Sequence, residues 1–294
     1  MANSSSAHKL SSKITAGRGP SDISLFGNLF NFSVIGFFCF IIVVPFFWLF
    51  TSSLKDMGQF CTVPIEWIPI PWHPDNYLVA MKAIPLMKYI TNSIVLAIIQ
   101  VIAGVFSSAL IAYGFARFRF PGRELMFVVL ISSMMLPWQA TTIPVFLFFR
   151  NLGWLNSFLP LVIPTFFGAA WNIFLLRQFF ISLPTSADEA ATIDGCGPLS
   201  IWWRIIIPQS KPVLVVVSLF TFMWSWKDVW GPLIYLNDQN LYTLPLGLLM
   251  FESPFEVKYT QQLAAVVIAI IPTVLFYIFG QRYLDRGITI ADVK

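Results

Sequence analysis

The sequence predicts an all-α integral membrane protein with six transmembrane helices. Hydrophobic residues make up 57% of the 294-residue chain and charged residues only 11%, with a mean hydropathy of +0.76. An average soluble domain carries about 25% charged residues, so the composition excludes that class. The apolar residues are also collected into separate long segments, and a helix of about 20 apolar residues can cross a bilayer.

The first of these segments follows a polar start. Residues 1–30 are predicted to form an N-terminal tail with three basic residues, Lys9, Lys13 and Arg18. The first transmembrane helix is predicted over residues 31–54, around an apolar core at 32–51. Because no charged start leads directly into a short apolar core, we expect no cleavable signal peptide and a first span that remains as an anchor.

Residues 55–88 are rich in proline and tryptophan and are predicted to form an irregular loop at the membrane interface. The other five spans are expected within a membrane core at residues 89–282, and residues 283–294 are expected to form a C-terminal tail. The five predicted helices cover residues 89–114, 125–149, 158–178, 213–234 and 261–281.

Six spans place both termini on the same side of the membrane, and the basic residues indicate which side. That side holds twelve Lys and Arg residues, while the opposite loops hold five: Lys55, Lys82, Lys88, Arg150 and Lys258. Loops rich in Lys and Arg stay in the cytoplasm. We therefore expect both termini in the cytoplasm of a multi-pass protein of the cell membrane, and residues 55–88 outside.

The longest polar interruption of the core is residues 186–212, which we call the knob. Thr185 or Ser186 can cap a helix at its start, and Ser186 with Glu189 has the spacing of a capping box. Asp188 and Glu189 then lie in the first turn, where the helix dipole favours negative charge.

A second short helix is expected directly after the first. Gly195 or Gly197 can end the first helix in a left-handed conformation, and Pro198 suits the first turn of the next. Two short helices at a sharp bend would make a compact projection that another protein can hold. They could equally be a plain connection, with Glu189 as a capping residue only.

A family resemblance favours the first interpretation. The knob resembles the EAA loop of binding-protein-dependent ABC importer permeases through Glu189-Ala190-Ala191, Asp194-Gly195, Ile205 and Ile207-Pro208. Residues 172–180 and 231–236 are similar to the carbohydrate branch, the MalG-type permeases. The likeness runs from about residue 32 to the C-terminus. Cys196 stands where the family usually has Ala, a change of similar volume that should preserve docking.

The resemblance implies a type I ABC importer permease fold with cytoplasmic coupling helices. It also implies partners: a second homologous permease, two cytoplasmic ABC ATPase subunits, and an extracytoplasmic solute-binding protein that faces residues 55–88. The expected ATPase-docking residues are Glu189, Ala190, Ala191, Asp194, Gly195, Pro198, Ile205 and Pro208. The C-terminal run 286–289 resembles a tail that reaches the ATPases, although the glycine-rich stretch usual after it is missing.

Motifs for covalent chemistry are missing from the sequence. No glycine is followed by lysine, so the phosphate-binding motif of ATPases cannot occur. The two histidines and three scattered cysteines have no metal-ligand spacing and suggest no disulfide. We expect no catalytic residue, no metal, no cofactor and no nucleic-acid partner, with ATP used by a separate subunit.

Lys227 and Asp228 form the most unusual polar pair in the predicted spans. About 14 residues into the fifth span, an unpaired charge should face protein or water rather than lipid. The pair could mark the translocation pathway with Trp224, or it could end the helix within an interfacial tryptophan belt. MalG-type relatives usually carry Asn at the Lys227 position, which makes an acid-bearing substrate conceivable. Gln139, Thr142 and Asn172 are further pathway candidates, although hydrogen bonding between helices would also explain them.

Together these observations predict the permease subunit of an ATP-driven importer for a sugar or related polyol. Two alternatives remain: an ion-coupled secondary transporter, with Asp228 as the only candidate ion site, and a membrane scaffold that transports nothing.

Overall fold

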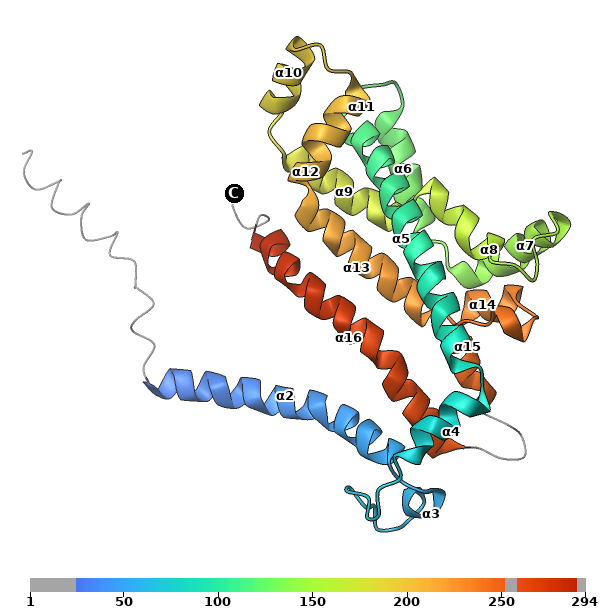
Figure 1. Cartoon of the computed structure of the whole chain (residues 1–294). Helices are drawn as coiled ribbons and strands as arrows, with labels where there is room; N and C mark the ends of the chain where they lie inside the picture. Colours follow the sequence, from blue (N-terminus) through green and yellow to red (C-terminus); the bar gives the residue numbers. More distant parts are fainter. Residues whose placement is uncertain (1–24, 252–257, 290–294) are drawn as a thin grey trace, which may run out of the picture. The chain divides into compact units, whose positions relative to one another are not determined.

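The computed structural model describes residues 25–251 and 258–289, and the side chains of residues 29–251 and 258–281. Every regular element in this described part is a helix, as the composition predicts (Figure 1). The chain divides into two units, Met1–Thr51 and Ser52–Lys294. The first unit contains most of α2 (Leu25–Ser53), an apolar helix long enough to span a membrane.

The second unit is built around α5 (Leu86–Arg117), whose 32 residues extend about 48 Å. Helices α9 (Ala170–Ser182) and α13 (Lys211–Lys227) pack along α5, and α16 (Tyr259–Thr289) packs along α13. Small residues on α5 permit this close packing, since Ala109 and Ala112 are fully buried. This packing of α9, α13 and α16 forms the helical core of the second unit.

The N-terminal end of α5 meets short helices from distant parts of the chain. They are α4 (Asp75–Ala83), η3 (Gln239–Leu241) and α15 (Leu244–Leu248), while α3 (Met57–Phe60) and η4 (Leu249–Phe251) pack against α16. The amide of Asn92 donates to the carbonyls of Asn240 and Tyr242 at 3.0 and 2.9 Å. These bonds hold the loop after α14 (Trp230–Tyr235) against α5.

The number of spans depends on two sharp bends. Four helices of the described chain are long and apolar enough to cross a membrane, and six spans result if each of two bent helix pairs counts as one. The predicted third span is not straight: α6 (Arg123–Ser133) and α7 (Trp138–Asn151) meet at 97°. The predicted fourth span is one of the four, Leu159–Ser182, and it consists of α8 (Leu159–Val162), η1 (Ile163–Phe167) and α9.

The fifth span also ends earlier than the sequence suggested. α13 stops at Lys227, and α14 begins separately at Trp230. Most of the predicted tails, residues 1–24 and 290–294, and the side chains of the run 286–289 lie outside the described residues.

Candidate functional site: the knob and its attachment

The first helix of the knob, α10 (Ser186–Ile193), begins where the sequence predicted, but without a side-chain cap. The N-cap residue is Thr185, and no side chain caps the free backbone N–H groups, so the capping box of Ser186 with Glu189 does not form. Instead the Thr185 hydroxyl donates to the Glu189 carboxylate at 3.0 Å. The Thr185 bond holds the exposed Glu189 side chain at the start of the helix.

The end of α10 is a Schellman turn centred on Gly195. Gly195 has a φ of +81°, a left-handed conformation that L residues with a side chain rarely adopt. The N–H of Cys196 donates to the carbonyl of Ala191 at 2.9 Å, and the N–H of Gly195 to that of Thr192 at 3.1 Å. Both Gly195 and Gly197 were candidates for the left-handed end of α10. Gly195 adopts that conformation, whereas Gly197 has an ordinary φ of −73°.

The second part of the knob starts at Pro198, in the first turn of α11 (Pro198–Ile201), as predicted. The helix then widens into a π-helical turn, η2 (Trp202–Ile206), and continues as α12 (Ile207–Gln209). It bends by 82° into α13. Single π turns inside α-helices are rare and often occur at functional sites.

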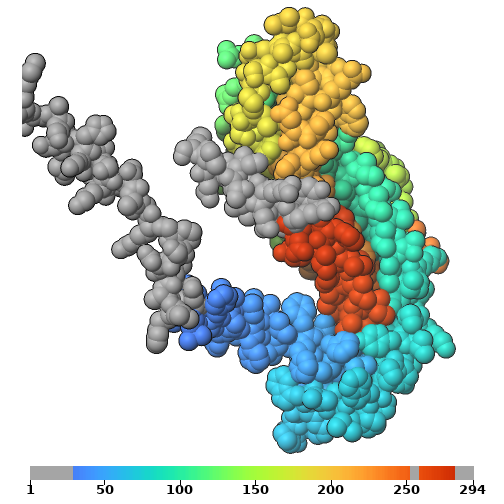
Figure 2. Space-filling model, turned by 60° about the vertical axis from the view of Figure 1, so that its left-hand side comes forward, coloured from blue at the N-terminus to red at the C-terminus, as the bar shows by residue number. Residues whose placement is uncertain are grey.

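Both knob helices are tied to the C-terminal end of α5 (Figure 2 shows this end of the molecule, with the knob in yellow and light orange). The guanidinium Nε of Arg117 lies 2.7 Å from Oδ2 of Asp188, and these side chains are only 11% and 15% exposed. Arg117 also donates to the carbonyl of Leu183 at 3.2 Å, just before α10. The Tyr113 hydroxyl donates to the carbonyl of Pro198 at 3.2 Å, so α11 is held as well.

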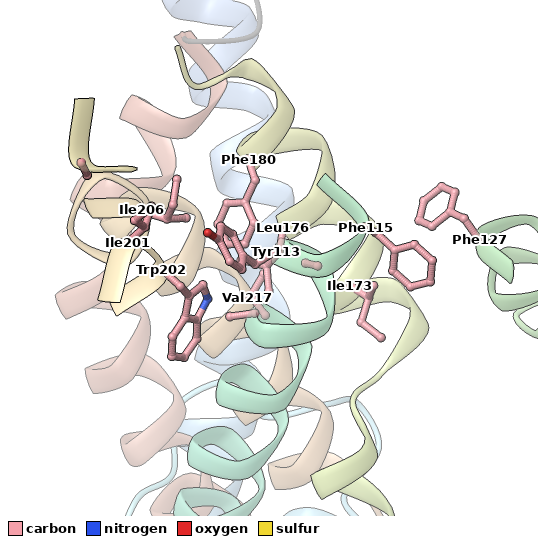
Figure 3. Close-up of a cluster of buried hydrophobic side chains, with 13 residues drawn as sticks. Tyr113, Phe115, Phe127, Ile173, Leu176, Phe180, Ile201, Trp202, Ile206 and Val217 are labelled. Carbon is pink, nitrogen blue, oxygen red and sulfur yellow. The ribbon is translucent and has the colours of Figure 1, made fainter. Parts of the chain in front are cut away.

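A hydrophobic cluster forms the base of the knob. Ile201, Trp202 and Ile206 are buried together with Leu176 and Phe180 of α9 (Figure 3). The Trp202 ring also meets the ring of Phe106 on α5 edge-on, with centroids 5.3 Å apart. Because protein interiors are close-packed, the base cannot move without displacing α5 and α9.

The tip of the knob has the opposite character. Two large apolar side chains are exposed on it, Ile193 at 86% and Leu199 at 67%. Neither Ile193 nor Leu199 is among the docking residues that the family resemblance implies. Their exposure, next to the exposed Glu189, makes the tip an amphipathic surface built on a rigid base.

The eight expected docking residues differ in where they lie. Six of them are exposed on the knob: Glu189, Ala190, Asp194, Gly195, Pro198 and Pro208. Ala191 is buried, and Ile205 is half-buried against the hydrophobic cluster. In this chain the last two side chains pack the base.

The pathway candidates lie in three different places. Asn172 is buried and its amide donates to the Thr221 hydroxyl at 3.1 Å, so it connects α9 to α13. Gln139 is exposed and Thr142 half-buried in the first turns of α7, where the Thr142 hydroxyl bonds to the carbonyl of Trp138. Trp224, Lys227 and Asp228 lie at the end of α13 far from the knob.

The segment of residues 55–88 is ordered by buried polar groups rather than by long helices. Lys55 is fully buried and its ammonium donates to the carbonyl of Glu66. Burial lowers the pKa of Lys55, and the nearby Glu66 charge partly opposes this effect. The segment nevertheless exposes apolar side chains, with Val63 at 90% and Ile70 at 81%.

Comparison with known proteins identifies the family. The chain matches the family described as "Binding-protein-dependent transport system inner membrane component" over residues 100–290. It is 31% identical over 253 residues to the diacetylchitobiose uptake system permease protein NgcG of Streptomyces coelicolor, covering 85% of this chain and 83% of the relative. It is 30% identical over 253 residues to the arabinooligosaccharides transport system permease protein AraQ of Bacillus subtilis, covering 85% and 90%.

A solved structure shares the fold. It is described as a bacterial ABC transporter involved in the import of the acidic polysaccharide alginate. The sequence of that chain is 23% identical to this one, and the two structures superpose with a TM-score of 0.79 over 91% of this chain and 99% of that chain. The all-α permease fold expected from the sequence is therefore confirmed. The chain belongs to the family of inner membrane components of binding-protein-dependent transport systems, and its predicted resemblance to MalG-type ABC importer permeases is confirmed.

Proposed function

We propose that this permease imports a carbohydrate, with ATP hydrolysed by a separate subunit that binds the knob. The two relatives described above are named as permeases for diacetylchitobiose and for arabinooligosaccharides. Both cargoes are oligosaccharides, which supports a sugar or a related polyol as the cargo of this chain.

One observation carries the proposal: the knob has an exposed amphipathic tip and a base fixed to the transmembrane helices. Apolar side chains such as Ile193 and Leu199 are costly to leave in water and favour a protein partner. The knob is bonded to α5 through the Asp188 carboxylate and the backbone carbonyl of Pro198. A force applied at the tip therefore reaches α5, which runs the full length of the core.

The same proposal assigns the remaining partners and the orientation. The twelve basic residues on the knob side, against five opposite, support a cytoplasmic knob and cytoplasmic termini. No phosphate-binding motif occurs in the sequence, so two ABC ATPase subunits would hydrolyse ATP. A second permease would complete the pathway, and a solute-binding protein would deliver sugar to residues 55–88.

Co-purification with the ATPase tests the docking. Glu189→Lys replaces an exposed carboxylate at the tip by a cation, and we expect recovery of the ATPase to fall about tenfold while the permease still inserts. Arg119→Glu is the matched control, because it reverses an exposed charge beside α5 but off the knob. If the Glu189→Lys permease recovers as much ATPase as the wild type, Glu189 has no part in docking and contributes only to the start of α10.

Uptake into cells tests the energy source. Sugar uptake should survive a protonophore and stop when ATP is depleted. Uptake that stops with the protonophore while ATP persists would instead support the ion-coupled alternative, with Asp228 as its candidate site.

A further inference from the structure

Two interrupted spans meet through a pair of tryptophan rings. The first interruption separates α6 from α7, which begins at Trp138, and the second separates α13 from α14, which begins at Trp230. The ring centroids of Trp138 and Trp230 are 5.9 Å apart. Inside a membrane, breaks in helices are tolerated where the backbone is buried in protein or lines a water-filled cavity, and they often mark binding sites.

Lys227 lies at the second break, as the last residue of α13. Lys227 is 16 residues beyond Lys211, which places it about 24 Å along α13. It belongs to an exposed stripe on one helix face with Trp224, Met223 and Phe220, which lie three, four and seven residues before it. Its ammonium lies 5.2 Å from the centre of the Trp224 ring. In the part of the chain that the structure describes, no carboxylate forms an ion pair with Lys227.

The neighbouring acid, Asp228, is occupied elsewhere. Its Oδ1 accepts the N–H of Gly231 at 3.1 Å, at the start of α14, where the helix dipole favours negative charge. A Cβ at position 231 would lie 2.5 Å from Oδ2 of Asp228, so only glycine leaves room for this arrangement. The fold thus turns the carboxylate back onto α14 and leaves the Lys227 ammonium available on the exposed stripe.

Resting on the proposed function, we propose that Lys227, Trp224 and Trp230 bind a carbohydrate that carries a carboxylate, such as a uronate. The ammonium would pair with the sugar carboxylate, and the exposed indole rings, at 69% for Trp224 and 58% for Trp230, would stack on the apolar faces of the sugar. The exposed amide of Gln139, beside Trp138, supplies both donors and an acceptor for sugar hydroxyls. Charge complementarity selects this occupant over a neutral sugar.

The test uses the complete importer with its solute-binding protein in proteoliposomes. ATP-driven uptake is measured for galacturonate, mannuronate and guluronate trisaccharides and for their neutral galactose, mannose and gulose counterparts. We expect at least one uronate trisaccharide to enter about tenfold faster than its neutral counterpart. Lys227→Gln should remove that preference, and Lys227→Arg should keep it within about threefold of wild type.

A second variant tests the role of the glycine. Gly231→Ala should displace the Asp228 carboxylate from α14 and weaken uronate uptake without changing the amount of inserted protein. Preference for neutral sugars, or unchanged uronate uptake by Lys227→Gln as expected of a lysine at the lipid interface, would overturn the acidic-sugar proposal and leave the importer intact. ATP-dependent uptake of no sugar at all would overturn both.

Discussion

Removing the carboxylate of Asp188 should uncouple ATP hydrolysis from transport. Among the described residues, Asp188 and Arg117 form the one ion pair between the knob and the transmembrane helices, at 2.7 Å. Asp188→Asn keeps the shape of the side chain but leaves the Arg117 guanidinium without its counter-charge. The change therefore tests the attachment of the knob and not its packing.

The size of the effect follows from the burial of the pair. Exposed ion pairs contribute about 0–1 kcal/mol, whereas removing one partner of a buried pair costs about 3–5 kcal/mol. With the two side chains 11% and 15% exposed, the pair lies near the buried limit, and we take about 3 kcal/mol. At about 1.4 kcal/mol per tenfold, the ratio of attached to detached knob falls by roughly 150-fold.

The assay compares two rates in proteoliposomes that contain the complete importer. In Asp188→Asn, ATP hydrolysis should continue because the exposed tip is unchanged, while sugar uptake per ATP should fall at least tenfold. The double variant Asp188→Arg with Arg117→Asp should recover only part of the coupling, because a cation in the first turn of α10 opposes the helix dipole. Arg119→Gln, which removes an exposed neighbouring charge, is the control and should behave as wild type. Unchanged uptake per ATP in Asp188→Asn would refute the reasoning.

Two glycines give further predictions. Gly195→Val forces a β-branched residue into a left-handed conformation at a cost of about 1–2 kcal/mol or more, so ATP-driven uptake should be lost while insertion persists; Gly197→Val, at a φ of −73°, is the matched control and should transport normally. Normal uptake by Gly195→Val would argue against a constrained joint. Gly247→Ala would place its methyl group against the Tyr89 ring, and overpacking of this kind costs about 1–3 kcal/mol, so the Tm of the purified permease should fall. Gly36→Ala, where nothing lies within 4 Å, should leave the Tm unchanged, and equal Tm values for both variants would contradict the close packing of α15 on α5.

Local signals in the sequence were enough to predict the all-α fold class and the helix end at Gly195 in the knob. Continuous apolar segments predict transmembrane helices because the bilayer requires a minimum length, and Gly195 could be read as a helix end because only glycine adopts a positive φ without strain. The break between α6 and α7 was not predicted, because Met134, Met135 and Leu136 continue the apolar segment, although Pro137 at the N-cap of α7 is a local signal for a helix boundary.

Contacts between distant residues could not be predicted from one sequence. Arg117 and Asp188 are separated by 70 residues of chain, and neither has a local pattern that names the other. The same holds for Tyr113 and the carbonyl of Pro198. The residues that hold the knob to α5 emerge only once the helices are packed.

Site-directed labelling tests the central claim, that the knob is the cytoplasmic surface that the ATPase holds. Ile193→Cys, at the 86% exposed tip, and Val63→Cys, at a 90% exposed position of the segment 55–88, are made with Cys39, Cys61 and Cys196 replaced by Ser. A membrane-impermeant maleimide should label Ile193→Cys only in inside-out vesicles and Val63→Cys only in right-side-out vesicles. Bound ATPase should protect Ile193→Cys alone. Labelling of Ile193→Cys from outside the cell, or labelling that the ATPase does not reduce, would contradict the account.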